Sequence, residues 1–244
     1  MRREPYEWRH EYDDCRIDQR TPPPSGSYTY PNTASAITAY TLDTGIYRNH
    51  SDFGSRAFYG HNFINRLGDS DPKNLANNND PAIADDCDGH GTHVAGIIGG
   101  TTAGVAKSVE LGGVKVLDCL GSGALEEVLA GIDWVTTNAV QPDVVNMSLG
   151  GDEVMPALDA AVRQSIASGL TYTVAAGNGN AYGNGVNASA LPGRLDHPAA
   201  VRACQPAVQH HRGVLATGGR PRELQVLRQR LVAIHRSFCV RLLG

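Results

Sequence analysis

From residue 36 onwards, short apolar runs alternate with stretches of helical periodicity, and this alternation limits the possible folds more than any other feature. A strand is predicted for residues 36–43 and another within 109–118; residues 143–151 are predicted to be a strand that runs into a glycine loop, and 170–180 a strand followed by a turn. Helices are predicted for residues 93–99, 125–135 and 154–169. Strands that alternate with helices are typical of βαβ units, whose helices cover both faces of a parallel sheet. We therefore predict an α/β fold with a doubly wound, mostly parallel sheet.

Two histidines stand three residues apart in DGHGTHVAG (88–96), where a helix is predicted to begin. Such a pair could share a metal ion, but HGTH lacks the acid of the H-E-x-x-H motif, so zinc is not expected. Taken alone, such a motif more often indicates two buried structural histidines. The first predicted strand ends at Asp43, and open α/β sheets carry their sites at the carboxyl ends of strands. Asp43 and His90 are therefore candidate site residues.

The composition changes sharply near residue 190. Up to that point the chain has 12 Lys and Arg against 23 Asp and Glu, and beyond it 9 Arg against 2 acids, with no Lys or Asn. A shift of reading frame near codon 190 would explain such a step. Apolar residues at heptad-like spacing in the tail indicate either a basic amphipathic helix for a membrane surface or partner, or a chance pattern. These residues are Leu224, Leu227, Leu231, Ile234 and Phe238.

Four motifs occur in an order and at spacings that resemble the subtilase family of serine endopeptidases, in particular its proteinase K and aqualysin branch. They are LDTG (42–45), DGHGTHVAG (88–96), VVNMSLGG (144–151) and TVAAGNGN (173–180). The resemblance implies a subtilisin-like fold, incomplete on its C-terminal side, and peptide-bond hydrolysis through an acyl-enzyme. It divides the chain into a non-family stretch (1–15), the N-terminal two-thirds of a catalytic domain (16–190) and an Arg-rich tail (191–244).

The resemblance assigns a role to each polar residue of these motifs. Asp43 would hold the imidazole of His90, the general base, while Asn178 would donate to the oxyanion and His93 would be structural. Segments that would pair with an extended polypeptide substrate contain Gly121, Ser122, Gly123, Ser148, Leu149 and Gly150. The specificity pocket would be lined by Ala175, Ala176 and Gly177.

The nucleophilic serine that the family carries in G-T-S-M-A-x-P has no counterpart in the sequence. The serines after Asn178 are Ser189 in NASAL and Ser237 in HRSFC, and neither follows Gly-Thr. Without a nucleophile, we expect this chain to be inactive. The alternative is a non-catalytic fragment or pseudoenzyme that binds peptides weakly at most.

The resemblance also implies a disulfide and calcium. Cys87 and Cys119 would form a disulfide, with two free thiols as the alternative. A structural calcium ion would be held by oxygen atoms of Asp18, Gln19, Ser25 and Ser27. The aspartate-rich loop 66–88 is either a second calcium loop or a solvated acidic loop.

The remaining expectations concern location and partners. By resemblance the protein is secreted, although its N-terminus shows no recognisable secretion signal. The sequence contains no run of 18 apolar residues, so no transmembrane helix is predicted. We expect a monomer that acts on polypeptides, without a nucleic-acid or membrane partner and without an organic cofactor.

Overall fold

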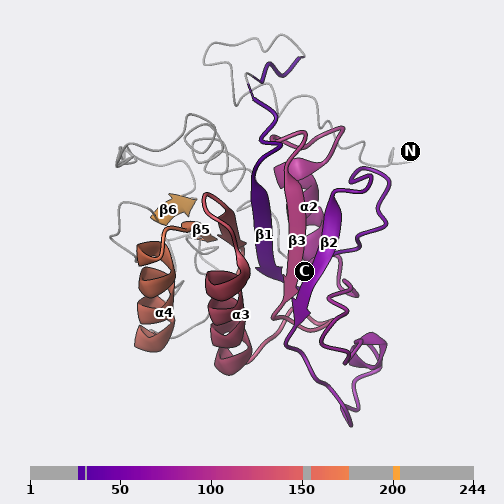
Figure 1. The fold of residues 1–244 in the computed structure, drawn as a ribbon. Coiled ribbons are helices and arrows are strands. Elements are labelled where there is room, and N and C mark those ends of the chain that lie inside the picture. The colour runs from indigo at the N-terminus through magenta and orange to yellow at the C-terminus, as the bar shows by residue number, and fades with distance from the viewer. Residues whose placement is uncertain (1–26, 31, 151–154, 176–199, 204–244) are drawn as a thin grey trace, which may run out of the picture.

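The computed structural model describes residues 27–30, 32–150, 155–175 and 200–203. Within these ranges the strands form one parallel sheet in the order β2-β3-β1-β4-β5-β6 (Figure 1). The strands are β1 (Thr38–Asp43), β2 (Ala57–Asn62), β3 (Glu110–Lys115), β4 (Val144–Met147), β5 (Thr171–Ala175) and β6 (Ala200–Ala203). The helices are α2 (His90–Gly99), α3 (Leu125–Asn138), α4 (Pro156–Ala167) and a 3-10 turn, η1 (Asn74–Ala76).

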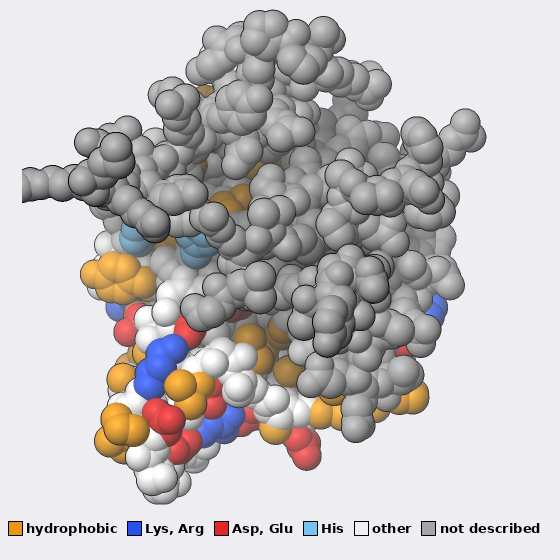
Figure 2. Space-filling view, turned by 180° about the vertical axis from the view of Figure 1, so that it is seen from behind, with side chains coloured by type: hydrophobic (Ala, Val, Ile, Leu, Met, Phe, Trp, Pro, Cys, Tyr) orange, Lys and Arg blue, Asp and Glu red, His pale blue; other side chains and the backbone are white. Residues whose placement is uncertain are grey.

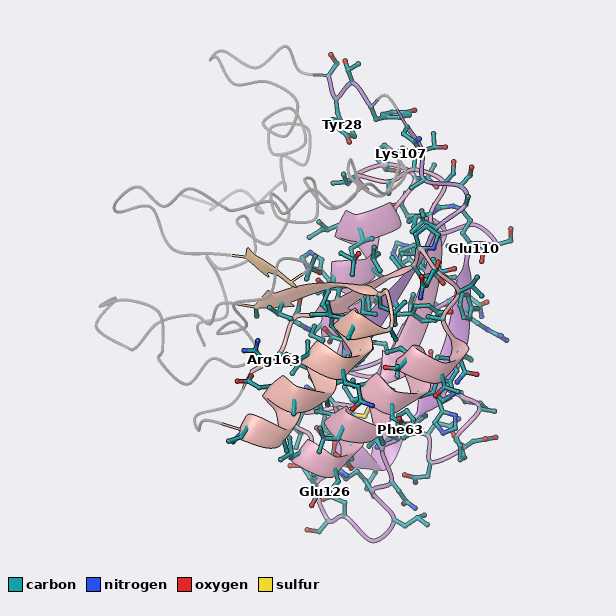
Figure 3. The ribbon with its side chains drawn as sticks, turned by 60° about the vertical axis from the view of Figure 1, so that its left-hand side comes forward. Tyr28, Phe63, Lys107, Glu110, Glu126 and Arg163 are labelled. Carbon is teal, nitrogen blue, oxygen red and sulfur yellow. A yellow bond between two sulfur atoms is a disulfide. The ribbon has the colours of Figure 1, made fainter. Side chains whose placement is uncertain are left out.

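Helices cover both faces of the sheet, which gives the fold two hydrophobic cores. Successive side chains of a strand point to opposite faces, so Ala39 of β1 joins the cluster that contains Ile98 of α2. Its neighbour Tyr40 joins the cluster that contains Ile132 of α3 and Val162 of α4. Figure 3 shows α3 and α4 lying side by side. The predicted doubly wound α/β fold is confirmed.

Most predicted elements are present, with two differences in the sheet. β2 was not predicted because it is an edge strand whose residues are mostly half-buried, so AFYGHN lacks both an apolar run and a clear alternation. β6 lies in the Arg-rich tail, for which no strand was predicted, and its backbone pairs in parallel with β5. None of the helices in the described part of the chain is long and apolar enough to cross a bilayer.

The helix α2 is fixed at its C-terminal end by Arg56. The guanidinium Nη1 donates to the carbonyl oxygens of Gly99, at 2.6 Å, and Val109, at 2.9 Å. Carbonyl groups in the last turn of a helix have no partner within it, and Arg56 supplies one from the turn before β2. The helix is therefore held against β3 at the end opposite to the site.

Candidate active site

Asp43 and His90 meet at the carboxyl edge of the sheet. Asp43 is the last residue of β1 and is fully buried, whereas His90 is the first residue of α2 and its side chain is 17% exposed. His90 Nδ1 lies 2.7 Å from Asp43 Oδ1, which also accepts the backbone N–H of Thr44 at 2.7 Å. A carboxylate only accepts hydrogen bonds, so this contact places a proton on Nδ1 and leaves Nε2 of the neutral ring as an acceptor.

The carboxylates around His90 favour its protonated form. The hydrogen bond from Asp43 raises the pKa of His90, burial lowers it, and the charges of Asp43, Asp88 and Asp86 raise it further, with a net increase above the usual value. Such a histidine accepts a proton more readily than an isolated imidazole, as a general base must. The other histidine, His93, lies in α2 but is exposed, so the motif does not hold two buried structural histidines.

Two glycines allow the strand and the helix to approach this closely. Gly45 has φ +111°, and a Cβ there would lie 2.6 Å from the carbonyl oxygen of Ala84. A Cβ on Gly91 would lie 2.2 Å from the carbonyl oxygen of Gly45. A larger residue at Gly91 would push α2 away from the end of β1, and one at Gly45 would displace the backbone of residues 84–85. These close contacts explain why glycine stands in LDTG and in HGTH, close to Asp43 and His90.

A buried lysine lies directly beside Asp43. Lys115 ends β3 opposite Asp43 in the sheet register, is fully buried and donates from Nζ to the Thr44 carbonyl at 2.5 Å. Burial lowers the pKa of Lys115 to about 8, against the opposing effect of nearby carboxylates, first that of Asp86. Sequence analysis missed this residue, although a lysine inside the apolar run VELGGVKVLD was a signal.

The predicted substrate segments follow the strands on either side of β1. Gly121–Gly123, which are exposed, follow β3, and Ser148–Gly150 follow β4. Since β1 lies between β3 and β4, the two segments flank the strand that ends at Asp43. Ala175 ends β5, next to β4. Ala176, Gly177 and Asn178 lie outside the described residues.

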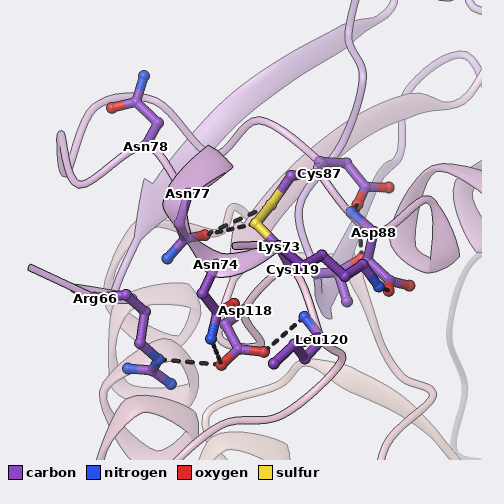
Figure 4. The surroundings of a disulfide bond; sticks show 12 residues. Arg66, Lys73, Asn74, Asn77, Asn78, Cys87, Asp88, Asp118, Cys119 and Leu120 are labelled. Carbon is purple, nitrogen blue, oxygen red and sulfur yellow. Dashed lines mark hydrogen bonds and ion pairs between the residues drawn. A yellow bond between two sulfur atoms is a disulfide. The ribbon is translucent and has the colours of Figure 1, made fainter. Parts of the chain in front are cut away.

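Asp118 holds the first of these segments in place. Its Oδ1 accepts the backbone N–H of Leu120 at 2.9 Å (Figure 4) and that of Ser122 at 3.0 Å. Its Oδ2 accepts from Arg66 Nε at 3.1 Å, and Arg66 also pairs with Glu127 in α3. Asp118 therefore ties the turn to α3 through one arginine. This carboxylate, too, was missed by sequence analysis.

A disulfide joins the segment before α2 to the predicted substrate segment that follows β3. Cys87 and Cys119 are bonded, as the resemblance implied, across a sequence separation of 32 residues (Figure 4). Cys87 lies three residues before His90, and Cys119 lies two residues before Gly121. The bond therefore links the residues just before α2 to the start of the predicted substrate segment Gly121–Gly123.

The acidic loop 66–88 distributes its carboxylates among separate partners. Asp69 accepts from Asn74, Asp80 accepts from Ala82, and Asp88 pairs with Lys73 at 2.7 Å. Figure 2 shows acidic and basic side chains interspersed over the surface drawn in colour. No group of three His, Cys, Asp or Glu in the described ranges could hold a metal ion. Of the four predicted calcium ligands, Ser27 is described, whereas Asp18, Gln19 and Ser25 lie outside those ranges.

Comparison with known proteins identifies relatives of this site and fold. The model of the subtilase family matches residues 36–219. An extracellular serine proteinase of Thermus sp. (strain Rt41A) is 52% identical over 165 residues, which are 68% of this chain and 37% of that protein. Proteinase T of Parengyodontium album is 44% identical over 162 residues, 64% of this chain and 50% of that protein.

A solved structure has the same fold. The crystal structure of a cold adapted subtilisin-like serine proteinase aligns with a TM-score of 0.68 and 41% identity, over 79% of this chain and 63% of that chain. The chain spans between 37% and 50% of the length of the two relatives above. The family match continues past residue 190, where we expected the resemblance to end. Since this match covers most of the sequence and contains the Asp43–His90 pair, the chain belongs to the subtilase family.

Proposed function

We propose that the chain carries the aspartate–histidine half of a serine endopeptidase active site. The 2.7 Å contact between His90 Nδ1 and Asp43 Oδ1 at the carboxyl edge of the sheet is the observation that carries this proposal. In the reaction, Nε2 of His90 takes the proton from a serine hydroxyl as it attacks the scissile carbonyl, and then returns that proton to the leaving amine. Asp43 orients the ring and stabilises the imidazolium.

The proposed substrate is a polypeptide in extended conformation. Its backbone would lie between the segments Gly121–Gly123 and Ser148–Gly150, which flank the end of β1. Small residues there let a peptide backbone approach and pair as an added strand. The proposed oxyanion donor is the side-chain amide of Asn178, whose loss would raise the barrier by roughly 3–4 kcal/mol.

We further propose that the 244 residues do not hydrolyse peptide bonds by themselves. They contain no Gly-Thr-Ser sequence, and neither Ser189 nor Ser237 lies in the expected context. Without a nucleophile, a subtilase loses about 10⁶-fold in kcat even where the fold is intact. What remains for such a chain is binding of extended peptides to the two glycine-containing segments.

The test combines this chain with a source of the nucleophile. Residues 1–190 are fused to the part of the Thermus proteinase that follows its matched region, and the product is called the fusion. We expect the fusion to cleave a fluorogenic protein substrate and to react with a serine-directed phosphonate, whereas the unmodified chain does neither. His90→Ala should abolish the activity of the fusion. An inactive but cooperatively folded fusion would contradict the proposed function, and phosphonate labelling of the unmodified chain would contradict its inactivity.

Compartment and calcium complete the proposal. A disulfide between Cys87 and Cys119 persists in an oxidising environment, which supports action outside the cell. Asp18, Gln19, Ser25 and Ser27 offer the oxygen ligands that calcium prefers. We expect calcium to raise the melting temperature of the chain, and Asp18→Asn to remove that increase. A melting temperature independent of calcium and chelator would contradict this site.

A further inference from the structure

Helix α2 begins without a capping side chain of its own. Its N-cap residue is Gly89, with φ +106°, and makes no side-chain hydrogen bond. The first N–H groups of a helix need acceptors from elsewhere. Thr44 Oγ1 accepts the N–H of Gly91 at 2.9 Å, and Asp86 Oδ2 accepts the N–H of Thr92 at 2.8 Å. The position of the helix that starts with His90 therefore depends on side chains outside it.

The carboxylate of Asp86 collects most of these bonds. Its Oδ1 accepts from Thr44 Oγ1 at 2.8 Å, from the N–H of Gly89 at 2.8 Å and from the N–H of Asp88 at 3.1 Å. Its Oδ2 accepts from both the N–H of Thr92, at 2.8 Å, and its hydroxyl, at 2.5 Å. One carboxylate thus bridges the turn after β1 and the first turn of α2.

These bonds end at the residues next to the catalytic pair. Thr44 follows Asp43, and Thr92 lies two residues after His90. A threonine hydroxyl has one proton; because that proton goes to Asp86, a lone pair of Thr44 Oγ1 faces the N–H of Gly91. Asp86 therefore orients Thr44 as well as binding it. We propose that Asp86 is a positioning residue that sets the Asp43–His90 contact. Its catalytic meaning rests on the function proposed above.

Asp86 has a matched counterpart in Asp88. Both carboxylates raise the pKa of His90 through their charge. The side chain of Asp88 pairs with Lys73 and accepts the backbone N–H of His90 at 3.3 Å, but it has no bond to Thr44. Removing either charge changes the electrostatic field at His90, whereas only removal of Asp86 breaks the hydrogen bonds between α2 and the turn after β1. Comparison of the two variants separates positioning from simple electrostatics.

The test is NMR of the full chain with a labelled His90 ring. A proton held between Nδ1 and a carboxylate resonates far downfield, and titration of the ring gives the pKa. We expect Asp86→Asn to abolish the downfield signal and to lower the pKa more than Asp88→Asn, which keeps the signal. Equal shifts with the signal present in both would overturn the proposal, because Asp86 would then act only as a charge.

A second pair of variants decides the question if Asp86→Asn does not fold. Thr44→Val keeps the shape of the side chain and the charge of Asp86 but removes the hydroxyl, whereas Thr44→Ser retains it. We expect the downfield signal to disappear in the valine variant and to persist in the serine variant. Identical spectra for the two would overturn the positioning role. These readouts need no nucleophile, so they stand or fall independently of activity in the fusion.

Discussion

Two Asp-Cys pairs, Asp86-Cys87 and Asp118-Cys119, end at the same disulfide but organise different parts of the edge of the sheet. Asp86 collects hydroxyl and backbone donors that fix the helix of His90, the proposed base. Asp118 collects two backbone donors and an arginine that fix the predicted substrate turn. The proposed base and the predicted substrate segment are thus held by separate carboxylates and share one covalent link, the disulfide.

The largest expected effect comes from cutting that link. The double substitution Cys87→Ser, Cys119→Ser should lower the free energy of unfolding by roughly 3–4 kcal/mol, since the bond closes a loop of about 30 residues in the unfolded chain. Urea titrations with and without reductant measure it. Reductant should destabilise the wild type and leave the double variant unchanged. Equal stability of the wild type and the double variant without reductant would show that α2 and the Gly121–Gly123 turn need no covalent link.

Removing the two carboxylates in the fusion should separate their roles. Asp86→Ala displaces the general base, and we expect about a 100-fold loss of kcat, or about 2.7 kcal/mol, with little change in KM. Asp118→Ala loosens the Gly121–Gly123 turn and should mainly raise KM. Steady-state kinetics on one peptide substrate measure both. If both variants lose kcat alone, the proposed division of roles is wrong.

The close approach at the base end can be tested with two glycines of the same helix. Gly91→Ala would place a Cβ 2.2 Å from the Gly45 carbonyl oxygen, and we expect a loss of about 2 kcal/mol. Gly96→Ala would place its Cβ 4.0 Å from the ring of Phe53, so the better helix propensity of alanine should add about 0.5–1 kcal/mol. Thermal unfolding of both variants gives the comparison. A neutral Gly91→Ala would mean that the contact can relax.

Periodicity predicted most of the sheet and its helices, because strands buried on both faces and helices with one apolar face leave clear patterns. The edge strand β2 was not predicted, since an edge strand needs less apolar surface and leaves no clear pattern. At the site, motif resemblance found Asp43 and His90. It could not show which of the aspartates in the loop would turn towards Thr44, because that choice is made by tertiary contacts. Asp118 had a signal: its run ends in Leu-Asp, as β1 does.

The smallest expected effect is on how stability depends on pH. The contributions of His90 and Asp118 change in opposite directions with pH. The folded pKa of His90 is raised, mainly by the Asp43 hydrogen bond, so its stabilising contribution is complete below about pH 6.5 and is lost as pH rises through the folded value. For Asp118, burial raises the pKa, but donors from Ser122, Leu120 and Arg66 outweigh it. Its contribution is therefore lost only as pH falls through that lowered value.

Melting temperatures of His90→Gln and Asp118→Asn between pH 5 and pH 9, each relative to the wild type, test this difference. The wild-type advantage over His90→Gln should shrink as pH rises, because the neutral ring gains less from Asp43 than the imidazolium does. The advantage over Asp118→Asn should stay constant, since Asp118 is ionised throughout this range. Parallel curves for the two variants would mean that protonation of His90 does not strengthen its contact with Asp43. The surroundings of His90 and of Asp118 would then differ in geometry alone.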